Sequence, residues 1–333
     1  MDILTQGLLG AVVAQTVSKP DEARKAGWTG FISGLLADVD VLIRSSTDPL
    51  LILEFHRHFT HSVFFIPVGA LIAALILYPF FKNNLAFQRV YLYAFAGFSL
   101  SGAIDACTSY GTYLFWPVID ERISLNIISI IDPVFTLSLM IAFIVVIVRQ
   151  QPRPAALTGL AFCGIYLVVA QVQQGRVEDE VRQLAASRGH KIEKMIIKPT
   201  LGNIILWRST YISNGRIVAD AVRVGLSGEP RIIQGASVPV FVPERDMPLL
   251  EKNSLLYIDI QRFIRLSDGF VARKPGSKHI IGDARYAMLP NSLEPLWGIV
   301  VDPDLPDKHV KYDTFRDNSK QLRQAFFTML TGK

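Results

Sequence analysis

Charged residues are distributed very unevenly along this chain of 333 residues. The first 172 residues contain 10 Lys or Arg and 11 Asp or Glu, whereas residues 173–333 contain 24 and 18. A segment embedded in lipid tolerates few charges, because moving a charge into hydrocarbon is costly. The division therefore predicts a membrane-embedded first half, residues 1–172, followed by a water-soluble second half.

Six apolar segments can be drawn in the first half, and they predict an α-helical membrane bundle. They are residues 3–17, 26–43, 62–81, 90–107, 125–148 and 155–172. A helix needs about 20 apolar residues to cross a bilayer, so the third and fifth segments are long enough and the fourth and sixth nearly so. The first two are short and interrupted, which suits helices buried within the bundle or lying partly in the interface.

Basic residues in the short loops predict how such a bundle is oriented. Residues 19–25, 82–89 and 149–153 hold seven of the ten Lys and Arg residues of this half. Cytoplasmic loops are enriched in Lys and Arg, so these loops are predicted to face the cytoplasm. With six alternating spans, residue 1 and everything after residue 172 then lie on the non-cytoplasmic side of a multi-pass membrane protein.

The second half is predicted to be a connecting helix, residues 173–190, followed by a small β-rich domain, residues 191–333. Gly189 is a stop signal for the connecting helix, and Asn214-Gly215 is a strong hairpin signal. A terminal helix is predicted at 314–330. The strand-like segments are 195–198, 203–213, 216–224, 231–234, 254–265, 279–288 and 296–301.

Composition argues against several classes of function. The net charge of +5 reflects a mild, scattered basic excess without a run of Lys or Arg, so nucleic-acid binding is not predicted. The two cysteines, Cys107 and Cys163, are too few for a disulfide framework. We interpret both as small buried apolar residues, with a metal-ligand role for Cys107 as the less favoured alternative. The N-terminus does not have the pattern of a cleaved signal peptide.

Ionisable side chains gather between two apolar segments. His56, His58 and His61, three of the six histidines, lie there with Asp38 and Asp40. Ionisable groups beside or inside a bilayer usually pair, bind ions or do chemistry. The cluster therefore predicts half of a metal site, although one interfacial histidine alone would more often reach for water or cap a helix.

The spacing of these residues limits how they can be arranged. His56 and His61 are five residues apart and would diverge on one continuous helix. We therefore expect His56 in the approach loop and His61 in the first turn of the next helix, with Thr60 as its N-cap. Asp38 and Asp40 can share one side of an unwinding helix end, as a metal ligand and its partner or base. A helix end reaching water is the alternative explanation.

The fourth apolar segment ends with a second polar group. Asp105 lies just inside an otherwise apolar run, and no basic residue lies within several positions of it. An unpaired buried carboxylate is costly, so Asp105 is predicted to need a cation. The hydroxyl-rich turn at 108–111 can line a pocket, whereas the aromatic residues at 113–116 are typical of an interfacial belt. Asp132 in the fifth segment is a further buried acid, with a supporting or structural role.

Taken in order, the motifs of the first half resemble those of the YdjM-like family of bacterial inner-membrane proteins, which are predicted metal-dependent hydrolases. The resemblance covers roughly residues 1–170. The motifs are Met1-Asp2-Ile3-Leu4-Thr5, Asp38-Val39-Asp40, His56-Arg57-His58-Phe59-Thr60-His61-Ser62, Asp105 to Thr112, Trp116-Pro117 and Ile131-Asp132-Pro133. Two departures stand out: the family usually has His in place of Gln6 and Pro in place of Ala37. His58 occupies a position that is more often small.

A membrane-bound, metal-dependent hydrolase is the first functional hypothesis. The expected ligands of a divalent metal are His56, His61, Asp105 and Asp40. Whichever of Asp38 and Asp40 does not bind the metal is the expected general base. The mixed ligands suit Zn²⁺, with Mn²⁺ or Fe²⁺ as alternatives. A metal-activated water would attack an amphiphilic, lipid-like ester or phosphoester at the membrane surface. The residues expected to support the ligands are Asp2, Gln6, His58, Thr60, Ser62, Tyr110 and Asp132.

Two alternatives remain open at this point. The first is a non-catalytic membrane protein with a structural or sensory metal site and a β domain that binds an envelope partner. The replacement at Gln6 favours it slightly. The second is a transporter, which is less favoured because the acidic and histidine residues lie at the ends of segments and not at their middles. Membrane lipids are expected neighbours in every case.

Overall fold

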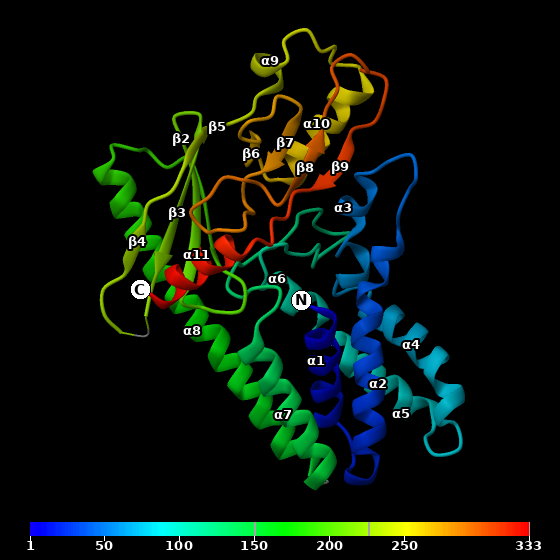
Figure 1. The fold of residues 1–333 in the computed structure, drawn as a ribbon. Helices are drawn as coiled ribbons and strands as arrows, with labels where there is room; N and C mark the ends of the chain where they lie inside the picture. Colours follow the sequence, from blue (N-terminus) through cyan, green and yellow to red (C-terminus); the bar gives the residue numbers. More distant parts are fainter. Residues whose placement is uncertain (150, 226, 333) are drawn as a thin grey trace. The chain divides into compact units, whose positions relative to one another are not determined.

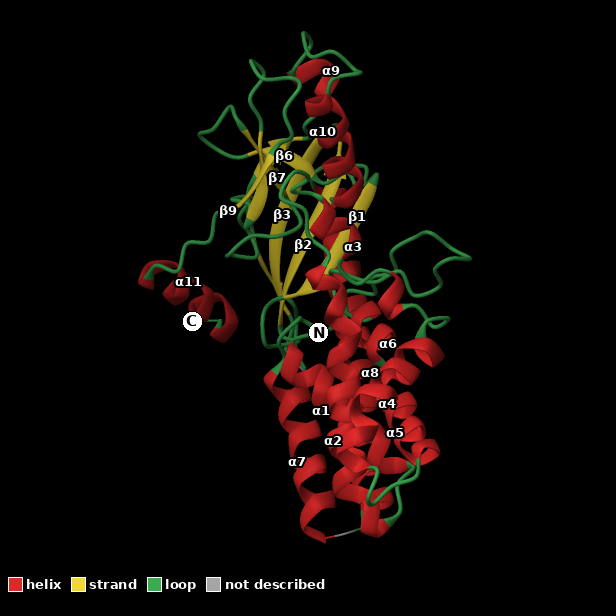
Figure 2. Cartoon of the chain, turned by 90° about the vertical axis from the view of Figure 1, so that its right-hand side faces the viewer, coloured by secondary structure: helices red, strands yellow, loops and turns green. Residues whose placement is uncertain are grey.

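The computed structural model describes residues 1–149, 151–225 and 227–332. It divides the chain into a helical unit (Met1–Ile43, Phe55–Val172 and Leu201–Asn203) and a β-rich unit (Arg44–Glu54, Gln173–Thr200 and Ile204–Lys333). The prediction of a helical N-terminal region followed by a β-sheet-rich C-terminal domain is confirmed (Figures 1 and 2). The sequence did not predict that residues 44–54 group with the β-rich unit.

The helical unit is built from helices joined by turns and by one long irregular segment, residues 107–132, between α6 and α7 (Figure 1). The α-helices are α1 (Ile3–Thr16), α2 (Ala23–Leu36), α4 (Ile66–Phe81), α5 (Phe87–Ser99), α6 (Ser101–Ala106), α7 (Pro133–Arg149) and the start of α8 (Pro152–Ser187). Between them lie the 3-10 helices η1 (Pro20–Glu22), η2 (Ala37–Leu42) and η3 (Phe59–His61). The short helix α3 (Leu51–Phe55) ends at Phe55, the residue at which the chain returns to the helical unit.

Glycine allows the backbones of α1, α2 and α5 to touch. A Cβ atom at Gly30 would lie 2.3 Å from the carbonyl oxygen of Gly10, and one at Gly97 would lie 2.5 Å from the Cα of Gly30. Close approach through small residues is typical of helices that pack within a membrane. The middle of α2 is thereby held closely against α1 and α5.

The predicted count of six membrane segments is not confirmed. Among the described residues, α8 is the one helix that is long and apolar enough to cross a bilayer by itself. A second candidate is the pair Leu51–His61 and Ile66–Phe81, which is bent by 88°. The predicted segment 125–148 becomes helical only at Pro133, because proline begins a helix well but cannot continue one from upstream.

Apolar side chains on the outer surfaces of three helices suit a lipid environment. Leu75 on α4, Ile141 on α7 and Ile165 on α8 are 58%, 60% and 65% exposed. The inner surfaces of the same helices pack into buried clusters around Ala73 and Leu139. The helices therefore have apolar surfaces on both sides, as segments inside a membrane do.

The β-rich unit contains two antiparallel sheets (Figure 2). The first consists of β1 (Lys194–Pro199), β2 (Leu206–Ser213), β3 (Arg216–Arg223), β4 (Arg231–Ile233) and β5 (Ser237–Pro239), with β4 and β5 both paired to β3. The second runs in the order β6 (Val271–Arg273), β7 (Ile280–Asp283), β8 (Trp297–Val300) and β9 (Lys311–Thr314). The unit also contains the second part of α8, from Gln173, most of α3, and the helices α9 (Pro243–Asp246), α10 (Leu255–Leu266) and α11 (Lys320–Thr331).

Local sequence signals were reliable in one place and misleading in another. The hairpin prediction is confirmed, because Asn214 and Gly215 both have positive φ and join β2 to β3. The prediction of an extended segment at 254–265 is wrong, because those residues form α10. Ser254 caps that helix by accepting a hydrogen bond from the Tyr257 N–H (3.3 Å). Its buried residues recur at helical spacing, at Leu256, Ile260 and Phe263.

Asp132 fixes the start of α7. Its Oδ1 accepts hydrogen bonds from the N–H groups of Val134 and Phe135, both at 3.1 Å. Its Oδ2 accepts one from the hydroxyl of Tyr166 on α8, at 2.8 Å. The fully buried carboxylate is therefore an N-cap that also joins two helices.

Replacing Asp132 with Ala should destabilise the helical unit. The variant loses a helix cap and leaves the Tyr166 hydroxyl unpartnered, which together should cost about 1–3 kcal/mol. Thermal unfolding of the purified protein in detergent measures this as a lower Tm. Tyr166→Phe removes only the bond between the helices and should lower the Tm less. Equal Tm values for Asp132→Ala and the wild type would contradict the capping role.

Candidate metal centre

Segments that are distant in the sequence meet at the amino end of α1. The N–H of Asp2 donates to the carbonyl of Ile130 (2.9 Å), and Arg57 Nη2 donates to the carbonyl of Met1 (3.2 Å). Arg57 Nη1 also donates to the hydroxyl of Thr108 (3.0 Å). The start of α1, the turn before η3 and the end of α6 therefore enclose one buried region of the helical unit.

Asp38 and Asp40 enter this region from η2. The helix α2 gives way to the tighter 3-10 helix immediately before them. Asp40 is 1% exposed, and its Oδ2 accepts hydrogen bonds from the Thr60 hydroxyl (2.6 Å) and the His58 N–H (3.2 Å). The side chain of Asp38 keeps 17% of its surface exposed. Asp40 is thus held inside the buried region, and Asp38 lies at its edge.

His61 lies among three carboxylates. Its Nε2 is 2.9 Å from Asp105 Oδ2 and 3.2 Å from Asp38 Oδ1, while its Nδ1 is 3.3 Å from Asp40 Oδ2. The residue is 2% exposed. The backbone of His61 packs directly against α6, because a Cβ atom at Gly102 would lie 2.0 Å from the His61 carbonyl oxygen. This close contact fixes the position of His61 relative to α6.

Asp105 has cationic partners that come from distant parts of the sequence. The carboxylate is fully buried, and Arg57 Nε lies 3.2 Å from its Oδ2. The ammonium group of Met1 donates to its Oδ1. The need for a cation that the sequence predicted is therefore met at least in part by the protein itself.

Three ligand atoms converge closely enough to share one ion. Asp38 Oδ1, His61 Nε2 and Asp105 Oδ2 all lie within 4.8 Å of one another. Tetrahedral Zn²⁺ with bonds of about 2.0–2.1 Å requires ligand atoms roughly 3.3 Å apart, close to the observed 2.9 and 3.2 Å. None of these three buried atoms makes a hydrogen bond of normal geometry within the described part of the chain, although Asp105 Oδ2 also forms an ion pair with Arg57 Nε. The residues present therefore fit a divalent ion held by one imidazole and two carboxylates.

His56 and Asp40, two predicted ligands, lie outside this group of converging atoms. His56 Nδ1 is 3.8 Å from Asp40 Oδ1, its side chain is 27% exposed, and its ring lies against Tyr110 at a centroid distance of 5.1 Å. Asp38 takes the place in the group that the sequence analysis gave to Asp40. That any of these residues binds a metal stays a prediction.

The expected role of Thr60 as a helix cap is wrong. The helix α4 begins only at Ile66, after an extended Ser62 and a turn at residues 63–65. Proline at the start of α4 sets that later beginning. His61 consequently ends η3 instead of lying in the first turn of α4. Thr60 acts through its hydroxyl, which holds Asp40 and lies 3.1 Å from His61 Nδ1.

Several residues predicted to support the ligands contact the surrounding fold. Asp2 caps α1 through Thr5, and Ser62 donates to the carbonyl of Trp116. The ring of His58 lies 4.4 Å from that of Tyr113.

Gln6 and Tyr110 complete the set of predicted supporting residues. Gln6 is 1% exposed, and its amide has no hydrogen-bond partner among the described residues. Tyr110 lies between the ring of His56 and the guanidinium of Arg122, whose Cζ is 4.5 Å from its centroid.

Arg57 is the important residue that the sequence analysis did not single out. It is 1% exposed, although it carries a charge, and its φ of +59° is rare for a residue other than glycine. The available signal was its position inside the His56–His61 motif, in a half of the chain that has few basic residues.

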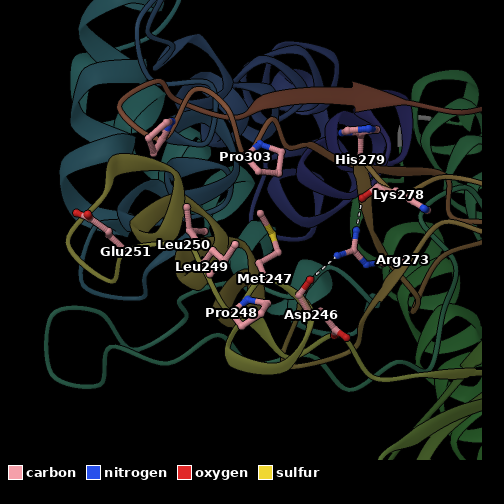
Figure 3. Close-up of a pocket in the computed structure, with 11 residues that line it drawn as sticks. Asp246, Met247, Pro248, Leu249, Leu250, Glu251, Arg273, Lys278, His279 and Pro303 are labelled. Atoms are coloured by element: carbon pink, nitrogen blue, oxygen red, sulfur yellow. Dashed lines mark hydrogen bonds between the residues drawn. The ribbon is translucent and has the colours of Figure 1, made fainter.

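Two further features lie in the β-rich unit. Asp48, Asp259 and His309 form a second group with converging ligand atoms, but the guanidinium of Arg262 already contacts both of these aspartates. A separate pocket of about 490 Å³ is lined by residues such as Met247 and Leu249 (Figure 3). It shares no residue with the candidate metal centre.

Comparison with known proteins identifies related sequences. The sequence model of a family described as "YdjM inner membrane protein" matches residues 1–177. The chain is 25% identical over 217 residues to "Uncharacterized protein YfhP" of Bacillus subtilis (strain 168), an alignment that covers 63% of this chain and 61% of YfhP. The chain thus spans less than two thirds of that relative's length. No solved structure matches.

Replacing Arg57 with Met should destabilise the helical unit strongly. Asp105 would keep its buried charge with one cation fewer, and breaking a buried ion pair in this way costs about 3–5 kcal/mol. Thermal unfolding in detergent measures the loss. The double variant Arg57→Met/Asp105→Asn removes both charges, so it should recover part of that stability. Losses that simply add in the double variant would show that the two residues are not coupled.

Proposed function

Because the chain belongs to the YdjM inner membrane protein family, we propose that it is a membrane-bound, metal-dependent hydrolase. Asp38, His61 and Asp105 would hold one divalent metal ion, with Zn²⁺ as the best match and Mn²⁺ or Fe²⁺ as alternatives. The observation that carries the proposal is the convergence of their three buried ligand atoms, which have no hydrogen bonds within the described residues.

Asp40 is proposed to orient the metal-binding imidazole. Its Oδ2 lies 3.3 Å from Nδ1 of His61, on the opposite side of the ring from Asp38 and Asp105. A carboxylate in that position fixes the tautomer of a metal-binding histidine and makes it a better ligand. Thr60 and the backbone of His58 hold Asp40 in place by donating to the same oxygen.

A bound divalent ion would supply Lewis acidity toward a carbonyl or phosphoryl oxygen and would activate water for attack. The more accessible residues at the edge are then Asp38, at 17% side-chain exposure, and His56, at 27%. Each can exchange a hydrogen bond or a proton with an incoming substrate group. We therefore assign substrate contact to Asp38 and His56, and support of the ligands to the buried Asp40.

An amphiphilic substrate, such as a lipid-like ester or phosphoester, is the proposed class. Val39 and Leu42, on the same 3-10 helix as the two aspartates, are 45% and 72% exposed. Apolar residues beside a polar site favour a substrate with one apolar and one polar part. From the loop charges, we propose that the site and the β-rich unit face the non-cytoplasmic side of the inner membrane.

A second candidate function is a non-catalytic membrane protein in which the same cluster holds helix ends together or senses an ion. The specific observation in its favour is that Arg57 and the Met1 ammonium already pair with Asp105. In that case the β-rich unit would be the functional part, through binding of an envelope partner.

Metal content and chelator-sensitive turnover decide between these functions. We expect the purified full-length protein to contain about one divalent ion per chain and to hydrolyse members of a panel of lipid esters and phosphoesters. A chelator should abolish turnover, and His61→Ala should lose both the ion and activity because its imidazole is the one nitrogen ligand of the proposed set.

His190→Ala is the matched control, since His190 contacts Tyr211 in the β-rich unit and lies outside the cluster. It should retain both metal and turnover. Bound metal without turnover on any substrate, together with a lower Tm in His61→Ala, would support the non-catalytic function instead.

A further inference from the structure

The stretch that connects the two halves of the candidate metal centre is built into the β-rich unit. Asp38 and Asp40 precede residues 44–54, and His56 and His61 follow them. Leu50 in this stretch is fully buried, in a core cluster that includes Leu256 and Ile260 of α10. The segment between the site residues therefore takes its position from α10.

Arg262 on α10 is the polar anchor of this stretch. Its Nη1 and Nη2 donate to the two carboxylate oxygens of Asp48, at 3.1 and 2.8 Å, and its Nε donates to Glu54 at 2.9 Å. A guanidinium can bind a carboxylate through two parallel hydrogen bonds, which fixes both direction and distance. One side chain thus holds residues near each end of the connecting stretch.

The arrangement around Arg262 is itself well fixed. Arg262 Nη1 also donates to Asp259 Oδ1 (2.9 Å), while Asp259 Oδ2 accepts from the N–H of Val310 (3.1 Å). Hydrogen bonding to Glu54 raises the pKa of Arg262 above its ordinary value. Partial burial opposes ionisation of Asp48, yet the hydrogen bond from Arg262 still lowers its pKa. Arg262 and Asp48 therefore both stay charged across the physiological pH range.

The covalent chain transmits this anchoring to the candidate metal centre. Glu54 is two residues before His56, and two residues extend over at most about 7 Å. On the other side, residues 43–50 have no regular secondary structure between η2 and α3. The packing of Leu50 and the contacts of Asp48 and Glu54 together define the path of this part of the chain.

We propose that Arg262 is a positioning residue for the metal centre: by fixing Asp48 and Glu54, it sets the path of the chain between Asp40 and His56. This inference rests on the proposed function, because it assumes that the cluster binds a metal.

The test is metal binding by full-length protein in detergent, with Zn²⁺ in competition with a chelator. Arg262→Ala should weaken Zn²⁺ binding on the order of tenfold, as loss of residues that orient ligands commonly does. The absorption spectrum of the Co²⁺-loaded protein should also change, because it reports the geometry of the ligands. Arg262→Lys retains the charge without the planar fork, so it should restore binding only in part.

Arg188→Ala is the matched control for general destabilisation of the β-rich unit. Arg188 makes a comparable two-bond pair with Asp220, at 2.6 and 3.1 Å, and also donates to the Tyr211 hydroxyl, so its hydrogen bonds lie on β2 and β3. This variant should lower the Tm while leaving Zn²⁺ affinity and the Co²⁺ spectrum unchanged. If Arg262→Ala fails to fold, Glu54→Gln provides the milder variant, and a smaller change in both readouts is expected from it.

The outcomes separate the two proposals. If the wild type binds Zn²⁺ but Arg262→Ala or Glu54→Gln binds it equally well with an unchanged Co²⁺ spectrum, the positioning role is overturned and the proposed function stands. If Arg188→Ala weakens binding as much as Arg262→Ala, the effect is general and the positioning role is also overturned. A wild type that binds neither ion overturns both proposals.

Discussion

Neutralisation of the buried carboxylate of Asp105 is the interaction on which the helical unit depends. An isolated charge in an apolar interior is too costly to keep, and its partners come from two distant places. Met1 belongs to the start of α1, whereas Arg57 and His61 belong to the segment around η3. Satisfying one carboxylate therefore draws separate helix ends together, and His61 then brings in the two aspartates of η2.

Much of the candidate site could be predicted because charged residues are rare in the first half of the chain. Asp38, Asp40, His61 and Asp105 stood out for that reason, and the structure gathers them. The choice between Asp38 and Asp40 could not be made from sequence, because it depends on how η2 turns. The role of Arg57 depends on a left-handed backbone conformation, which its residue type does not suggest.

The fold shows the same difference between local and long-range causes. The Asn214-Gly215 hairpin follows from the backbone preferences of two residues, so the sequence was sufficient. The isoleucine, tyrosine and phenylalanine residues of α10 are also common in strands, and the helical spacing of its buried apolar residues, Leu256, Ile260 and Phe263, shows the helix. Nothing local in residues 44–54 reveals that they complete the core of a unit formed much later in the chain.

That late completion has a consequence for synthesis. Arg262 follows Asp48 by 214 residues, so Leu50 leaves the ribosome long before α10 exists to cover it. Contacts of such long range form slowly and leave apolar surface open in the meantime. A chain that stops before α10 leaves Leu50 uncovered, and a fragment that begins after Val172 lacks the side chain that fills this part of the core. The core of the β-rich unit is therefore complete only when both the early segment and the late helix have been made.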